Sequence, residues 1–195
     1  MIVKVLTLMV AATLLLGGGS AALADNVALN KAVTLDGAFG SDPSMASTVD
    51  NGVFLAKGTD WKTGTVWWEG EASTIVIDLG GLYNITGLIV QADCNDAYQV
   101  SYRAGTSGAW TDVWLVPNLG AVIPGMLTRP NPDNNSEEQT ISTIVAQQFK
   151  IQASSGDGQY AVSEFQAYGN PVPLPGAVWL LGSGLGFLTW RRRRH

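Results

Sequence analysis

Hydrophobic and polar positions alternate over short stretches in the middle of the chain, and this alternation predicts β-strands. Six such stretches cover residues 73–79, 85–91, 99–103, 110–116, 148–153 and 163–168. Gly80 and Gly81 are expected to end the first strand, because paired glycines usually mark a turn. Since no segment carries a long helical period with capping residues, we expect an all-β fold, an antiparallel sandwich or jelly roll.

Residues 116–141 are rich in Pro and Asn and show no clear period. They predict the one long irregular stretch of this middle region. A segment of this length without secondary structure is either a large loop on a binding face or a mobile insertion.

The N-terminal region has a different pattern. Lys4 precedes an apolar run at residues 5–16, and the sequence Ala22-Leu23-Ala24 follows after small residues. This pattern predicts a cleavable signal peptide over residues 1–24. The alternative is an uncleaved membrane anchor, although the run is short for a span. The folded domain is therefore expected at residues 25–169, in a protein exported through the inner membrane and processed by signal peptidase.

Residues 170–195 form a second atypical end. A proline-rich segment is followed by an uncharged apolar stretch at 176–190, which predicts a hydrophobic helix with a cytoplasmic basic end. The tail resembles the PEP-CTERM class of bacterial sorting signals. The residues that carry this resemblance are Val172, Pro173, Leu174, Pro175, Arg191, Arg192, Arg193 and Arg194. It implies recognition by an exosortase and a cell-surface or extracellular location. Gly176 departs from the usual alanine, and a plain C-terminal membrane anchor is the alternative.

Charge narrows the choice of partner. Of the 11 basic residues, five (Lys4 and the four terminal arginines) lie outside 25–169, whereas all 16 acidic residues lie within it. The domain is therefore strongly acidic, with a net charge of −10. Such a surface disfavours nucleic acid and anionic lipid, and it suits sugars or divalent cations.

Two single residues limit the chemistry. Cys94 cannot form an internal disulfide; it is either a small half-buried residue or an intermolecular link. The single histidine, His195, lies outside the domain. A Ser-His-Asp triad and a histidine zinc site are therefore excluded from the domain, and we expect no enzyme activity. A two-carboxylate glycan hydrolase remains a remote alternative.

Four motifs, in order, resemble discoidin domains, also called coagulation-factor type C domains. They are Ala28-Leu29-Asn30-Lys31, Val49-Asp50-Asn51-Gly52 followed by Trp61, Ile77-Asp78-Leu79-Gly80, and residues 161–169. The resemblance implies a galactose-binding-like jelly-roll sandwich. Two features differ: the disulfide of many animal members is absent, and the segments after Trp61 and Trp114 are longer.

Many carbohydrate-binding discoidin modules hold a structural calcium ion, so the resemblance also implies a metal site. The residues at the matching positions are Asp50, Thr59, Asp60 and Glu164. Calcium prefers six to eight oxygen ligands, and backbone carbonyls would complete such a set. The alternative is that Asp50 makes an Asx turn and Glu164 is a solvated strand residue.

The remaining candidates concern a ligand. Asp93, Asn95 and Asp96 fall in a predicted turn, where they either serve the turn itself or contact a ligand. Trp61 and Trp114 are expected in the core. Trp67 and Trp68 point to opposite faces if extended, so one should be exposed. The candidates for ligand contact are thus Trp67, Trp110, Arg103, Asp93, Asn95 and Asp96.

Two functions fit these observations. The first is a non-catalytic module that binds a glycan, such as an exopolysaccharide or a cell-surface sugar. The second is a structural protein of the extracellular matrix or biofilm with no specific glycan ligand. The discoidin resemblance, the exposed aromatic candidates and the acidic surface favour the first function, and the sorting tail favours the second.

Overall fold

A computed structural model describes residues 24–40, 43–120 and 124–173. This part of the chain is all-β apart from one 3₁₀ helix, as predicted. The strands are β1 Asp25–Asn26, β2 Ala32–Asp36, β3 Val66–Glu69, β4 Thr74–Asp93, β5 Ala97–Arg103, β6 Thr111–Val116, β7 Met126–Arg129, β8 Gln139–Ser155 and β9 Gln159–Pro171. The helix η1 covers Pro43–Thr48.

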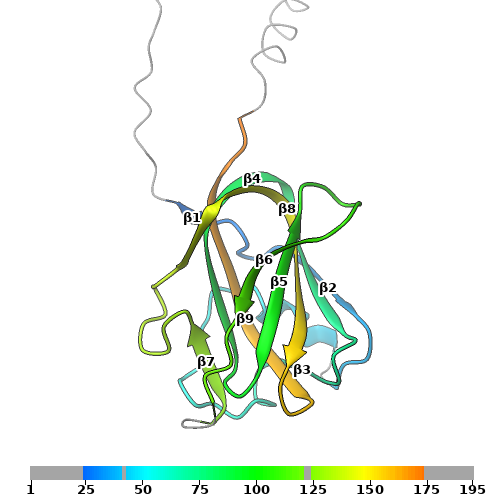
Figure 1. Cartoon of the computed structure of the whole chain (residues 1–195), viewed down its shortest axis with the longest axis vertical. Helices are drawn as coiled ribbons and strands as arrows, with labels where there is room; N and C mark the ends of the chain where they lie inside the picture. Colours follow the sequence, from blue (N-terminus) through cyan, green and yellow to red (C-terminus); the bar gives the residue numbers. More distant parts are fainter. Residues whose placement is uncertain (1–23, 41–42, 121–123, 174–195) are drawn as a thin grey trace, which may run out of the picture.

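All strand pairs in the described chain are antiparallel, and the hydrogen-bonded path runs β1-β9-β4-β8-β5-β6. Strand β2 and strand β7 pair with opposite ends of β4, and β3 pairs with β9. The long strands β4 and β8 bend near their middle, so that each belongs to both layers of the jelly roll (Figure 1).

Strand β4 corrects one prediction. Gly80 and Gly81 do not end a strand, because the chain continues through them to Asp93. Gly80 has a φ of 77°, and its N–H is bonded to Asp78 Oδ1 at 2.8 Å. The register against β8 shifts between Asp78 and Tyr83, so the glycines bend the strand instead of terminating it.

The prediction that residues 116–141 are irregular is also wrong in part. Residues 126–129 form β7, whose register pairs Val90 with Arg129 and Asp93 with Met126. The strand β8 already begins at Gln139. All four residues of β7 are buried, so the strand shows none of the alternation that would reveal it in a sequence.

The core between the layers is aromatic at its centre. The ring of Trp68 is fully buried and stacks on Tyr160, with ring centroids 5.9 Å apart. The rings of Phe39 and Tyr98 meet Trp68 edge-on, at 5.5 Å and 6.1 Å. Such pairs stabilise a core beyond the area they bury. The tryptophan at the centre of the core is therefore Trp68, whereas Trp61 and Trp114 were the tryptophans predicted to lie in the core.

The predicted burial of the tryptophans is confirmed at some positions and wrong at one. Trp67 is half-buried beside fully buried Trp68, as expected for neighbours in a strand. Trp114 is partly buried and packs against the core. Trp61, in contrast, lies outside the core cluster and is half-buried at the surface. Its position was predicted wrongly, because it lies in a loop before β3 where no strand period indicates its direction.

The two ends of the described chain lie together, at the top of Figure 1, where Asp25 of β1 pairs with Gly169 of β9. The β4–β5 turn, the β8–β9 turn and the loop before β3 gather at the opposite, lower end (Figure 1). We call this lower end the loop end. Among the described residues, no helix is long and apolar enough to cross a membrane. The predicted signal peptide and the predicted helix at 176–190 lie outside the described residues.

Candidate functional site

A hollow of about 180 Å³ opens at the loop end between four segments of the chain. The indole of Trp61 forms one wall. The other lining residues are Asp93, Cys94, Asn95, Pro124, Gly125, Asp157 and Gln159. We call this hollow the Trp61 pocket. An aromatic face beside carboxylate and amide groups is the combination that can stack a sugar ring and bind its hydroxyls.

Hydrogen bonds between turns build the polar wall of the Trp61 pocket. Asn95 donates from its amide to Asp157 Oδ2 at 2.8 Å, which joins the β4–β5 turn to the β8–β9 turn. The other oxygen of Asp157 accepts from Gln159 N at 2.9 Å. Asp93 Oδ1 accepts from Cys94 N at 2.8 Å. The structure therefore brings the predicted residues Asp93 and Asn95 together in one pocket wall.

Arg129 lies behind this wall and is fully buried. Its guanidinium donates to the backbone carbonyls of Ala92 and Leu127 at 2.6 Å and 2.8 Å. It also donates to the carbonyl of Asp93 at 2.5 Å. Longer bonds reach the carbonyls of Asp96 and Pro117. A single side chain thus joins β4, β7, the β4–β5 turn and the segment after β6.

Asp96 is fully buried and does not line the pocket, unlike its predicted partners. Its Oδ1 accepts from Asp157 N at 3.3 Å, and its Oδ2 accepts from the hydroxyl of Tyr98 at 3.4 Å. Burial, together with the nearby carboxylates of Asp93 and Asp157, raises the pKa of Asp96 to about 7. The side chain therefore fixes the two turns from beneath instead of contacting a ligand.

Trp67 lies next to the Trp61 pocket. The rings of Trp61 and Trp67 meet edge-to-face, with centroids 5.4 Å apart and an interplanar angle of 82°. The ammonium of Lys62 lies 4.5 Å from the Trp61 centroid and 4.3 Å from the Trp67 centroid. We call these two rings the tryptophan ridge. Trp67 also lines a second, open hollow of about 310 Å³ with Ala38, Phe39, Gly40 and Glu69.

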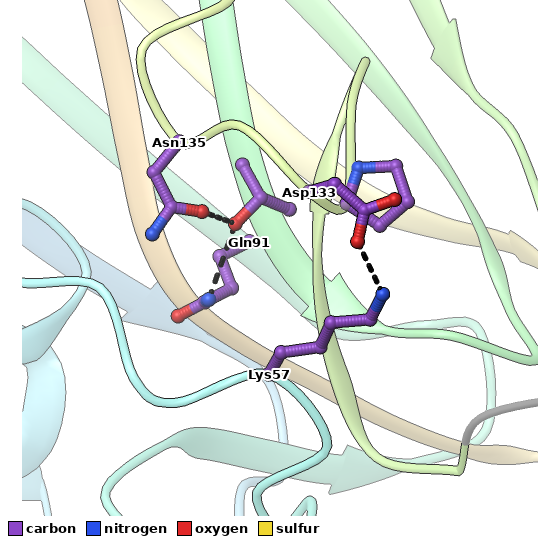
Figure 2. Close-up of a pocket in the computed structure, with 6 residues that line it drawn as sticks. Lys57, Gln91, Asp133 and Asn135 are labelled. Carbon is purple, nitrogen blue, oxygen red and sulfur yellow. Dashed lines mark hydrogen bonds and ion pairs between the residues drawn. The ribbon is translucent and has the colours of Figure 1, made fainter.

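A third hollow, of about 240 Å³, is lined by Lys57, Gln91, Thr128, Pro132, Asp133 and Asn135 (Figure 2). Gln91 and Asn135 both bond to the Thr128 hydroxyl, at 3.2 Å and 2.6 Å. Lys57 and Asp133 form an ion pair of 2.5 Å across its opening. The polar groups of this hollow bond to one another, and no aromatic side chain lines it. It therefore lacks the stacking surface of the Trp61 pocket.

Arg103 and Trp110, which were predicted as ligand contacts, lie at the β5–β6 hairpin away from the loop end (Figure 1). The Arg103 guanidinium lies 4.3 Å from the Trp110 centroid, and Lys150 lies 5.5 Å from it. Arg103 also donates to Gln148 Oε1 at 2.8 Å. The structure thus separates these two residues from Asp93, Asn95 and Trp67.

The predicted calcium ligands separate in a similar way. Asp50 and Glu164 are both buried close together, and Gly52 N donates to Glu164 Oε1 at 3.0 Å. The second oxygen, Glu164 Oε2, is buried with no hydrogen-bond partner. Burial, with the nearby charge of Asp50, raises the pKa of Glu164 to about 7. An orphaned carboxylate oxygen beside a second carboxylate fits a cation.

Thr59 and Asp60 make local contacts instead. The Thr59 hydroxyl donates to the carbonyl of Ala56 at 2.7 Å, and Asp60 Oδ1 accepts from Lys62 N at 2.9 Å. In the described part of the chain, no three His, Cys, Asp or Glu side chains gather as a metal group. A calcium ion held by Asp50 and Glu164 would therefore need backbone carbonyls for most of its other ligands.

Comparisons with known proteins now place the fold. No model of a known protein family matches the chain, and no curated protein matches it. Solved structures do match. One is a chitosan-binding module from a chitosanase/glucanase of Paenibacillus sp. IK-5, with a TM-score of 0.51, 18% identity, and coverage of 74% of this chain and 99% of that chain.

Two further structures are similar. A fucolectin from striped bass, Morone saxatilis, has a TM-score of 0.57 and 14% identity, covering 77% of this chain and 50% of that chain. A family 32 carbohydrate-binding module of EndoD from Streptococcus pneumoniae has a TM-score of 0.51 and 11% identity, covering 74% and 99%. At these identities the likeness concerns the fold, and it confirms the predicted discoidin-like jelly roll.

Several residues of the Trp61 pocket were not predicted from the sequence. Asp157 lies in the short turn between β8 and β9, flanked by two glycines, and Gln159 is the first residue of β9. That glycine-flanked turn was the available signal. Trp61 was assigned to the core. Arg129 received no role, because a lone arginine in a stretch without alternation gives no sign of being buried.

Proposed function

We propose that this protein is a non-catalytic carbohydrate-binding module that binds glycan at its loop end, through the Trp61 pocket. The observation that carries the proposal is that Trp61 lines one hollow together with Asp93, Asn95 and Asp157. A sugar ring has an apolar face that suits the indole, and hydroxyls that suit carboxylate and amide groups. The similar solved structures are carbohydrate-binding modules and lectins, which supports this proposal.

The acidic groups of the loop end serve binding in this proposal, and they do not act as a catalytic pair. Asp96 is buried beneath the turns, and the Asp157 carboxylate is engaged by Asn95 and by Gln159 N. A glycosidase needs one carboxyl as acid and another as base or nucleophile, both facing the bond to be cleaved. Carboxylates held in hydrogen bonds to their own turns serve as fixed acceptors for sugar hydroxyls.

We also propose that the module is exported and presented at the cell surface by its C-terminal tail. The described chain ends at β9, at the opposite end of the sandwich from the Trp61 pocket (Figure 1). A tail that continues from β9 would therefore leave the loop end directed away from the membrane. Signal peptidase and an exosortase are the processing enzymes that this arrangement requires.

We also propose that the module binds a calcium ion with a structural role. Asp50 and Glu164 would hold it, with backbone carbonyls near Gly52, and it would neutralise two buried carboxylates. Thr59 and Asp60 are left out of the ligand set because their side chains are engaged locally. The ion would fix the loop before β3 against β9.

The proposal is tested on a glycan array with the purified full-length protein, in a detergent that has no sugar headgroup. The expected result is binding to a limited set of glycans, lost in Trp61→Ala. The matched control is Trp110→Ala, which removes an indole of similar exposure at the hairpin. A failure of the wild-type protein to bind any glycan, or equal loss in both variants, would overturn the proposal.

A further inference from the structure

Trp61 lines the Trp61 pocket and Trp67 lines the second hollow, and the two rings of this tryptophan ridge are in contact, with centroids 5.4 Å apart. The register of β3 against β9 places Glu69 directly opposite Gln159. Gln159 lines the Trp61 pocket, and Glu69 lines the hollow beside Trp67. The two hollows are therefore neighbours on one surface, with an aromatic pair between them. A ligand long enough to cross the ridge would contact both.

The charged side chains that line these two hollows are all acidic. Asp93 and Asp157 line the first hollow, and Glu69 lines the second. Asp93 is only 5% exposed, and its Oδ1 is bonded to Cys94 N. The side chain of Cys94 also hydrogen-bonds to this carboxyl group. A lining whose charged groups are all acidic favours a ligand that carries positive charge.

Two cations lie close by, and in the described part of the chain neither forms an ion pair with the acidic residues of the hollows. Arg129 is fully buried, and its guanidinium donates to backbone carbonyls behind the wall. Lys62 places its ammonium over both rings of the tryptophan ridge, at 4.5 Å and 4.3 Å from their centroids. An ammonium is thus already stabilised at this ridge by the electron-rich indole faces.

We propose that the two hollows are successive subsites for a linear glycan whose sugars carry free amino groups. This inference rests on the proposed function and names its ligand class. The ring faces of consecutive sugars lie against Trp61 and Trp67, and their ammonium groups face Asp93 and Asp157 on one side and Glu69 on the other. A charged hydrogen bond from an ammonium to a carboxylate is stronger than a neutral one. A polyuronate would bring like charges together at the same positions.

The test measures binding by titration calorimetry with the full-length protein. The probes are a glucosamine oligomer, the N-acetylglucosamine oligomer of the same length, and monomeric glucosamine. We expect the oligomer with free amines to bind about tenfold or more tightly than its acetylated counterpart, an advantage of about 1.4 kcal/mol. We also expect it to bind more tightly than the monomer, and to lose affinity as salt is added.

Variants separate this inference from a general sugar site. Asp157→Asn and Glu69→Gln are expected to reduce the preference for free amines, whereas Asp36→Asn, an exposed carboxylate of β2, leaves it unchanged. Lys62→Ala is expected to raise affinity for the amine-bearing oligomer, because it removes a like charge and uncovers both indoles. With an anionic glycan the same substitution would lower affinity.

The outcomes are distinguishable. Equal or tighter binding of the acetylated oligomer, or a loss of affinity in Lys62→Ala, overturns the cationic ligand class. Equal affinity for monomer and oligomer overturns the two-subsite path. In these cases binding that depends on Trp61 would leave the proposed function standing. Absence of any glycan binding would overturn both.

Discussion

Arg129 donates a 2.5 Å hydrogen bond from its guanidinium to the backbone carbonyl of Asp93, the last residue of β4. The side chain of Asp93 lines the Trp61 pocket, so a fully buried cation positions the strand end that supplies the pocket wall. The guanidinium geometry is needed here, because several carbonyls in different directions accept from one planar group.

Arg129→Lys is therefore expected to destabilise the protein by about 3 kcal/mol, since an ammonium cannot reach the same set of carbonyls and leaves some unbonded. Urea unfolding measures this loss. The surface substitution Lys150→Arg is the control, with an expected change within about 0.5 kcal/mol. A loss of less than about 1 kcal/mol in Arg129→Lys would mean that the carbonyls find other donors.

The two adjacent tryptophans of β3 give a second prediction. Trp68→Ala removes a fully buried ring from the aromatic core and is expected to cost about 3–5 kcal/mol. Trp67→Ala removes a half-buried ring at the surface and should cost much less. Thermal unfolding of both variants checks the difference. Similar losses in the two would contradict the assignment of Trp68 to the core and Trp67 to the surface.

These contrasts show what the sequence can and cannot reveal. Strands β5 and β6 were predicted close to their observed bounds, because each carries a local alternation of apolar and polar positions. Whether Gly80 ends or bends β4 depends on β2, β8 and β9, which pair along the whole strand. That information is long-range, and no local pattern contains it. The strand β7 was missed for the same reason.

The residues of the candidate site also differ in whether the local sequence predicts them. Asp93 and Asn95 were predicted because polar residues between two strands indicate a turn. The glycine-flanked turn around Asp157 was visible in the sequence, but its pairing with Asn95 could not be predicted, since the Asn95–Asp157 bond joins turns 62 positions apart in the chain. The assignment of Arg103 and Trp110 to the same site failed because sequence order does not show at which end of the sandwich a hairpin lies.

Calcium gives a third prediction. If Asp50 and Glu164 hold the ion, calcium at a hundredfold excess over its dissociation constant stabilises the fold by about 2.7 kcal/mol. The midpoint of thermal unfolding should then rise by several degrees relative to chelator. Glu164→Gln should abolish the rise. Asp60→Asn is the matched control and should retain it, because Asp60 bonds to Lys62 N. Retention of the full rise in Glu164→Gln would exclude this site.

The pH dependence of stability gives a fourth prediction. The pKa of Glu164 is raised from 4.5 to about 7 by burial and by Asp50, whereas Gln166 and the N–H of Gly52 oppose the rise. Between these values the native state binds a proton more readily than the unfolded state. The free energy of unfolding therefore falls as pH rises through this window, on the order of 3 kcal/mol for Glu164 alone.

Urea unfolding across this window, in the presence of chelator, measures the fall. Asp96, with its pKa raised to about 7, contributes in the same direction. Glu164→Gln should remove part of the fall, and added calcium should reduce it in the wild-type protein by favouring the ionised carboxylate. A profile in Glu164→Gln that matches the wild type would show that Glu164 ionises normally in the fold.

The central claim is that glycan binds at the loop end against Trp61. The most direct test is the dissociation constant for one bound glycan, measured by titration calorimetry for the wild type, Trp61→Ala and Trp110→Ala. The account predicts at least about a tenfold weakening in Trp61→Ala, or about 1.4 kcal/mol, and a change within about twofold in Trp110→Ala. Unchanged affinity in Trp61→Ala, or a loss confined to Trp110→Ala, would contradict it.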